Sequence, residues 1–132
     1  MIDFDTVKNY RVLLVGDAIV DEYVYVRTIG KAIKENALSS MRLKTEQFRG
    51  GVWAAAQHLV SFCAQVAVMT GDKLMHNSRL VDEIYLRKLF VTHELRDNPE
   101  PPAQFDIGSF DLVIVCDFGH GAMTKELIAK LS

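Results

Sequence analysis

Short apolar runs alternate with polar turns along this chain, and three of the runs have the form of buried strands. Each run is four or five residues long, and a turn that contains an aspartate follows it. Continuous apolar runs of this length are typical of parallel strands that are covered on both faces. We therefore predict a central parallel sheet formed by Val12–Val15, Val66–Thr70 and Leu112–Cys116.

The aspartates after these strands are Asp17, Asp72 and Asp117. Because the carboxyl ends of parallel strands meet at one edge of a sheet, we expect the three carboxylates to gather there. A polar turn must also follow any buried strand for structural reasons alone. Each aspartate taken singly therefore fits a structural role as well as a functional one.

An amphipathic helix is predicted between the first two strands. Apolar residues recur there at three- and four-residue spacing from Val52 to Cys63. Gly50 and Gly51 precede this segment and would leave the first backbone N–H groups of the helix open to a polar or anionic ligand. A tight turn explains the two glycines equally well.

Alternating apolar and polar residues mark a different region, from Glu22 to Phe48, where we predict half-exposed antiparallel strands. The segment Ile29–Asn36 between them lacks a clean period and is expected to form a loop. Leu80–Leu95 fits a helix in its first half and a strand in its second, and we favour strands. Thr124 is expected to cap a last helix. Three residues of that helix are predicted to face inward: Leu127, Ile128 and Leu131.

The composition is that of an ordinary globular protein, because 49% of the 132 residues are hydrophobic and 24% are charged. The net charge of -2 and the lack of a basic stripe argue against nucleic acid as a partner. No apolar run approaches the ~18 residues that a membrane span requires. Cys63 and Cys116 lie in apolar runs, so we expect buried free thiols and a cytoplasmic protein.

Common nucleotide and metal motifs do not occur in the sequence. No Gly-x-Gly-x-x-Gly follows the first strand, no P-loop is present, and the four histidines lack the spacing of a zinc site. What remains is a set of acids and glycines at strand ends and at a helix start. Carboxylates accept hydrogen bonds from hydroxyl groups, so this set suits a polyhydroxylated ligand. Its members are Gly16, Asp17, Asp21, Gly50, Gly51 and Asp117.

The order of these motifs resembles the amino-terminal part of ribokinase-like (PfkB) carbohydrate kinases. The matching motifs are Val-Gly-Asp-x-x-x-Asp-x-Tyr, the glycine pair before an alanine-rich helix, Val-x-Val-x-Thr-Gly-Asp, and Asp-Leu-Val-Ile-Val-x-Asp-Phe-Gly-His-Gly. The branch most similar in pattern contains the sugar-phosphate kinases of ADP-heptose synthesis. The resemblance implies a three-layer α/β fold with a parallel sheet and a small β-strand lid at about residues 22–48. The length of the chain predicts a single domain, residues 1–132, or part of one.

The resemblance also implies roles for the candidate residues. Asp21 would hold sugar hydroxyls, and Asp117 would line the crevice near the transferred phosphate. Four further residues would border the sugar pocket: Gly16, Asp17, Gly50 and Gly51. The implied reaction is phosphoryl transfer to the hydroxyl of a sugar or sugar phosphate, and the family alone implies ATP and Mg²⁺ as cofactors.

The chain departs from the family pattern at three places. Alanines at 54–56 stand where the family carries an asparagine, and a helix and a strand are missing after Asp72. The sequence ends at Ser132, before the Gly-Ala-Gly-Asp segment that supplies the family's catalytic base. We therefore assign no catalytic residue and expect a kinase domain that is incomplete at the C-terminus and is truncated, degenerate or one piece of a larger assembly. Such a domain would bind a sugar but would not turn over alone.

Two other interpretations remain. The chain could be a non-catalytic interaction module in which the lid strands pair as a homodimer, since exposed strands offer unpaired backbone groups. It could also be a phosphoacceptor domain of flavodoxin-like fold, although it lacks the paired acids after the first strand that would hold magnesium. The sequence favours the sugar-binding interpretation.

Overall fold

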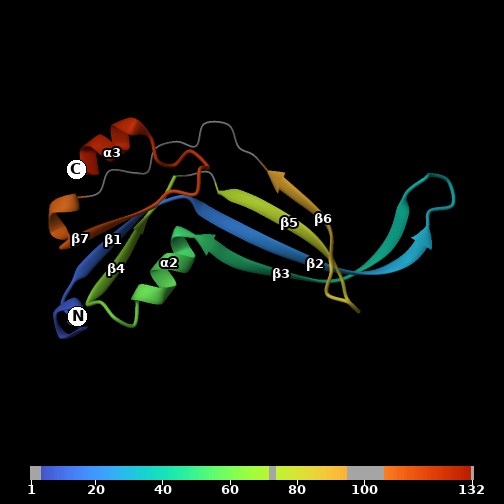
Figure 1. Cartoon of the computed structure of the whole chain (residues 1–132), viewed down its shortest axis with the longest axis horizontal. Coiled ribbons are helices and arrows are strands. Elements are labelled where there is room, and N and C mark those ends of the chain that lie inside the picture. The colour runs from blue at the N-terminus through green and yellow to red at the C-terminus, as the bar shows by residue number, and fades with distance from the viewer. Residues whose placement is uncertain (1–3, 72–73, 95–105, 132) are drawn as a thin grey trace. The chain divides into compact units, whose positions relative to one another are not determined.

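The computed structural model describes residues 4–71, 74–94 and 106–131 of a mixed α/β chain (Figure 1). It divides into two compact units. Unit 1 comprises Met1–Ile19, Arg49–Met75 and Leu95–Ser132, and unit 2 comprises Val20–Phe48 and His76–Glu94. The elements in chain order are α1 (Phe4–Val7), β1 (Arg11–Gly16), β2 (Ala18–Lys31), β3 (Leu38–Gly51), α2 (Val52–Leu59), β4 (Gln65–Met69), β5 (Met75–Asp82), β6 (Lys88–Glu94), a 3₁₀ turn η1 (Ile107–Ser109), β7 (Leu112–Cys116) and α3 (Lys125–Leu131).

Unit 1 contains a three-stranded parallel sheet with β1 in the middle. The strand order is β4-β1-β7, and Val12 pairs with Val66 on one side and with Leu112 on the other. The prediction of three parallel strands at these places is confirmed. The apolar run Val12–Val15 is fully buried because a neighbouring strand lies on each side and a helix covers each face.

Alternate side chains of β1 point to opposite faces of the sheet and build two hydrophobic clusters. The cluster that includes α2 is formed by Val12, Leu14, Ala18, Val52 and Ala56. The cluster that includes α3 is formed by Leu13, Val15, Met69 and Leu127. This double coverage explains why β1 reads as a continuous apolar run instead of an alternating one.

The helix α2 is shorter than the sequence predicts. It ends at Leu59, whose carbonyl accepts the backbone N–H groups of both Phe62 and Cys63. The chain then turns into β4, and the Ala64 N–H donates to the carbonyl of Tyr10. Val60, expected on the buried stripe, is instead 61% exposed because it lies beyond the last helical residue.

The last helix begins as predicted. The Leu127 backbone N–H donates to the Thr124 hydroxyl at 3.1 Å, so Thr124 satisfies one of the free N–H groups at the start of α3. Leu127 is buried in the core. The prediction that Ile128 faces inward is wrong: this side chain is 48% exposed, since the sheet covers only one narrow stripe of the helix.

Unit 2 contains a second sheet with the strand order β3-β2-β5-β6. Residues 32–37 join β2 to β3, and a connection this short permits only antiparallel neighbours, as the sequence predicts. The predicted loop Ile29–Asn36 begins later than expected, because β2 continues to Lys31. A backbone hydrogen bond from Ala32 to Ala37 (2.8 Å) closes the loop.

The remaining strands of unit 2 confirm the preference for strands in Leu80–Leu95, as far as the described residues reach. β5 and β6 pair antiparallel, with Asn77 opposite His93. The contacts between β2 and β5 rise in the same order along both strands, from Asp21–Asn77 through Glu22–Ser78 to Val26–Glu83. These two strands therefore run in the same direction, and the sheet is mixed.

The remaining sequence predictions concern Asp72, the two cysteines and membrane spans. Asp72, the acid predicted after the second strand, lies outside the described residues. Cys63 and Cys116 are free thiols but only half-buried, because Cys63 lies beyond the end of α2 and Cys116 lies on an outer strand of its sheet. Among the described residues, every helix is too short or too polar to cross a bilayer.

Candidate functional site

The carboxylate of Asp17 organises the strand ends of unit 1. This side chain is 3% exposed, and it accepts three backbone N–H groups from the segment after β7. The donors are Phe118 at 2.8 Å, His120 at 3.2 Å and Ala122 at 2.9 Å. Asp17 thus fixes the loop 117–122, a role that sequence reasoning did not predict for it.

Two glycines next to Asp17 in space or sequence allow close backbone packing in unit 1. Gly51 has φ of 62°, and a Cβ atom there would lie 2.2 Å from the carbonyl oxygen of Asp17. The next residue, Val52, donates its N–H to that same oxygen at 2.9 Å. At Gly16, a Cβ atom would lie 2.0 Å from the carbonyl oxygen of Cys116. Close backbone packing therefore accounts for both glycines.

Asp117 and Gly50 complete the predicted residues of unit 1. Asp117 is exposed at the start of the loop, and its Oδ1 accepts the Gly119 N–H at 2.9 Å. Gly50 is half-buried near the end of β3. The structure thus connects Gly16, Asp17, Gly51 and the 117–122 loop through direct backbone contacts.

Asp21 lies on β2 in unit 2, where its carboxylate has one engaged oxygen and one open oxygen. Oδ1 accepts Asn77 Nδ2 at 3.1 Å and also pairs with the Arg79 guanidinium. Among the described residues, no donor bonds to Oδ2. The side chain is one-quarter exposed, so Oδ2 can accept a hydrogen bond from a ligand.

A third polar residue fixes the orientation of the Asn77 amide. His93 lies opposite Asn77 on β6, and its Nδ1 lies 2.6 Å from Asn77 Oδ1. With Nδ1–H as the donor, the amide oxygen accepts from His93 while the amide nitrogen donates to Asp21. The chain of hydrogen bonds therefore holds Asp21 in one rotamer.

The pKa of Asp21 is lowered from its ordinary value of 3.8. Burial alone would raise this pKa, but hydrogen bonds from Arg79 and Asn77, together with the positive charges of Arg79 and Lys88, outweigh that effect. The group is consequently a carboxylate at neutral pH. It is an acceptor only, which is the chemistry that a hydroxyl ligand requires.

A hollow of about 330 Å³ lies beside Asp21, and aromatic side chains form the rest of its lining: Tyr23, Tyr25 and Phe48. The rings of Tyr23 and Phe48 meet edge to face at 5.6 Å, and the Arg79 guanidinium lies 5.2 Å from the Tyr23 ring. The Tyr25 hydroxyl donates to Glu46 at 3.0 Å. Lys44 Nζ lies 4.4 Å from the centre of the Tyr25 ring. This part of unit 2 therefore combines an ionised carboxylate with three aromatic side chains.

The opposite face of β2 has a different role. Glu22 follows Asp21 directly, so its side chain points to the other side of the sheet. It accepts hydrogen bonds from Gln47 at 3.1 Å and from Ser78 at 3.1 Å, one at each carboxylate oxygen. Both oxygens of Glu22 already accept hydrogen bonds within the sheet. Substitution of Glu22 is therefore a matched control for substitution of Asp21.

The structure assigns the six predicted residues to different units: Asp21 belongs to unit 2, and the other five belong to unit 1. That they surround one sugar pocket stays a prediction. Sequence reasoning missed Asn77, Arg79 and His93, which complete the surroundings of Asp21. The two-residue repeat of a strand was the available signal, since it puts Asn77 and Arg79 on one face once Leu80–Leu95 and the residues before it are taken as strands.

Comparisons with known proteins give little further information. The sequence matches no protein-family model, and no curated protein matches it. One solved structure, a provisionally named ribokinase from Agrobacterium tumefaciens, is 18% identical with a TM-score of 0.44, over 81% of this chain and 44% of that one. A carbohydrate kinase from Agrobacterium tumefaciens is 13% identical with a TM-score of 0.33, over 65% of this chain and 36% of that one. The chain thus spans less than half the length of either neighbour, and likeness this low assigns no function to it.

Proposed function

We propose that this chain is the sugar- or sugar-phosphate-binding part of a PfkB-type carbohydrate kinase. The observation that carries the binding proposal is the hollow in unit 2, where Asp21 meets the rings of Tyr23, Tyr25 and Phe48. Sugars present hydroxyl groups around their rim and C–H groups on their faces. A carboxylate that accepts hydroxyls, next to aromatic rings that cover apolar C–H surface, suits both features.

The contacts of Asp21 indicate which of its carboxylate oxygens is free to bind the sugar. Its Oδ2 accepts a sugar hydroxyl, while Oδ1 stays bonded to Asn77 and Arg79. Because Arg79 carries five N–H donors, it retains donors for a second hydroxyl or for a phosphate oxygen of the ligand. A sugar phosphate is therefore proposed as a ligand alongside a neutral sugar.

The kinase part of the proposal is supported by the order of the sequence motifs. Phosphoryl transfer from ATP with Mg²⁺ is what the resemblance implies, with Asp117 near the transferred phosphate. Among the described residues, no group of three or more His, Cys, Asp or Glu side chains stands together to hold a metal ion. We therefore derive no catalytic step through a metal and assign no catalytic residue.

Calorimetry tests the binding proposal. The ligands are D-fructose 6-phosphate, D-ribose 5-phosphate and D-sedoheptulose 7-phosphate, titrated into the wild type, Asp21→Ala and Glu22→Ala. The two variants are matched, since each removes a β2 carboxylate that accepts two cross-strand hydrogen bonds. We expect at least one ligand to bind the wild type and Glu22→Ala, and to bind Asp21→Ala at least about tenfold more weakly, as for one charged hydrogen bond.

Two results would contradict the proposal. One is the absence of heat with every sugar phosphate on the wild type. The other is equal affinity of the wild type and Asp21→Ala for the ligand that binds. Circular dichroism of each variant shows whether its sheets are intact, so a loss of binding through misfolding is separated from the loss of a contact.

A further inference from the structure

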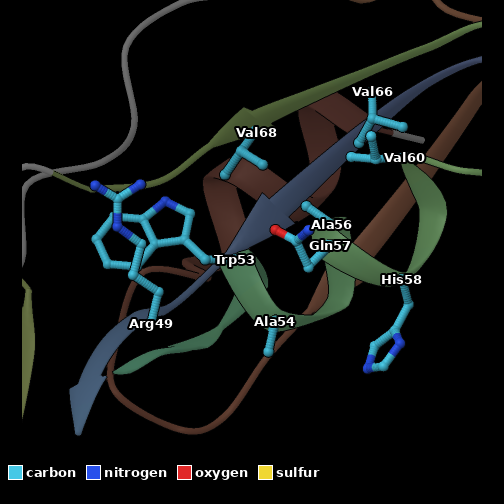
Figure 2. Close-up of a pocket in the computed structure, with 9 residues that line it drawn as sticks. All are labelled: Arg49, Trp53, Ala54, Ala56, Gln57, His58, Val60, Val66 and Val68. Carbon is cyan, nitrogen blue, oxygen red and sulfur yellow. The ribbon is translucent and has the colours of Figure 1, made fainter. Parts of the chain in front are cut away.

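A second hollow, of about 520 Å³, lies within unit 1, and none of the six candidate sugar-pocket residues lines it. Figure 2 shows its lining, which comes from α2 and Val60 just after it, from β4, and from Arg49 near the end of β3. The volume lies in the range of small-molecule sites in proteins. The inference below is independent of sugar binding, because no residue of the unit 2 hollow takes part.

The walls of this hollow are largely apolar. Val66 and Val68 of β4 face it together with Val60, which follows α2. Val66 and Val68 pack against the α2 cluster but are only half-buried, so part of each side chain stays accessible from the hollow. An apolar body can therefore enter the hollow without displacing a packed side chain.

One end of the hollow carries hydrogen-bond donors. The Arg49 guanidinium lies 5.2 Å from the ring of Trp53 (Figure 2), and no described carboxylate forms an ion pair with Arg49. The indole N–H of Trp53 and the amide of Gln57 likewise bond to no described acceptor. No Asp or Glu occurs among the described residues that line the hollow, so its charge is positive in a chain of net charge -2.

We propose that this hollow binds a small organic anion with a flat apolar body, such as an aromatic carboxylate. The anionic group pairs with Arg49 and accepts the Trp53 indole N–H, because charged acceptors make the strongest bonds to a guanidinium. The flat body packs between the Trp53 ring and the valines of β4. A neutral molecule of the same shape lacks the first contact, and a cationic one is repelled by Arg49.

The indole N–H of Trp53 reports on this site directly. Trp53 is the single tryptophan of the chain, so its indole gives one resonance in a ¹H–¹⁵N spectrum that needs no assignment. Three probes of one shape are titrated: 2-naphthoate, its neutral amide and its cationic amidine. We expect a saturable shift of the indole resonance with naphthoate, about tenfold weaker binding of the amide and no binding of the amidine.

Substitutions locate the anion. Arg49→Gln is expected to weaken naphthoate binding about tenfold, and Arg49→Lys, which keeps the charge but not the planar stacking, to weaken it less. Arg87→Gln removes an equal charge from unit 2 and should leave the affinity unchanged. If Arg49→Gln loses the dispersion of its backbone resonances and is therefore misfolded, the proposal is tested by the wild type alone. The measurement is then the difference in affinity between 2-naphthoate and its neutral amide.

Three outcomes would overturn the proposal. They are an indole resonance that naphthoate does not shift up to its solubility limit, an amide that binds as tightly as naphthoate, and a folded Arg49→Gln variant with wild-type affinity. Each leaves the sugar-binding proposal untouched, because the calorimetry of Asp21→Ala concerns other residues.

Discussion

Replacement of Asp17 by alanine should destabilise unit 1 more than any exposed aspartate does. The substitution leaves three backbone N–H groups without their carboxylate acceptor. The Ala122 donor is buried, so its loss costs about 2 kcal/mol, whereas water can reach the donors of Phe118 and His120, which cost about 1 kcal/mol each. The sum of about 4 kcal/mol is a large part of the ~5–15 kcal/mol that holds a domain folded.

Asp17→Asn refines this test. An amide keeps the shape of the side chain but has one acceptor oxygen, so either Ala122 or the other two donors would face an NH₂ group. We expect about half the effect of alanine, near ~2 kcal/mol. An intermediate value distinguishes the loss of acceptors from the loss of side-chain volume.

Urea unfolding followed by Trp53 fluorescence measures the effect, since Trp53 lies in the same unit as Asp17. Asp5→Ala is the control: the side chain of Asp5 is exposed and its ion pair with Lys8 is a surface pair, so the change should stay below about 0.5 kcal/mol. A free energy of unfolding for Asp17→Ala within about 1 kcal/mol of the wild type, at an unchanged urea dependence, would refute this account of the loop.

The remaining predictions concern the packing of Gly51, the titration of Asp21 and pairing of the lid strands between two chains. Gly51→Ala should cost at least about 2 kcal/mol in urea unfolding, because its Cβ meets the Asp17 carbonyl, whereas Gly119→Ala, with φ of 77° and open space around it, should cost about 1 kcal/mol; equal costs would contradict the clash. The lowered pKa of Asp21 stabilises the folded chain at pH above the ordinary 3.8, and this contribution is lost as pH falls through the folded value. Carboxyl ¹³C NMR should therefore show Asp21 titrating below 3.8, and at a higher pH in Arg79→Gln; an unchanged pKa in that variant would remove the stated cause. If the lid strands form a homodimer, light scattering should give twice the chain mass for the wild type and a monomer for Leu43→Glu, since Leu38, Met41 and Leu43 are exposed on the outer lid strand β3; a wild-type monomer would remove that idea.

The sequence predicted the parallel sheet well because burial on both faces leaves a strong pattern. Val12–Val15 is apolar at every position, and only a central strand covered by helices requires that. The N-cap of α3 could also be predicted, since a threonine just before an apolar stripe is a local signal for the start of a helix. The end of α2 could not, because Val60 and Cys63 continue the helical spacing, and the chain after the helix is held by a bond from Ala64 to distant Tyr10.

The candidate site also combines features that the local sequence predicts with features that depend on distant contacts. Asp21 and Asp17 are both acids near a strand end, and nothing local distinguishes them. Their environments do: three backbone donors from the 117–122 loop surround Asp17, while Asp21 keeps one open oxygen. Those partners are more than fifty residues away in the chain, so only the pairing of strands reveals which carboxylate can meet a ligand.

The pairing of β1 with β7 also constrains how the chain is made. Asp17 and its first donor are separated by 101 positions, and β1 meets β7 across a similar interval. During synthesis, the most apolar strand therefore emerges long before its second neighbour exists. Contacts of such long range close slowly, so the nascent chain is expected to need shielding of β1, by α2 and β4 or by a chaperone, until the last strand has left the ribosome.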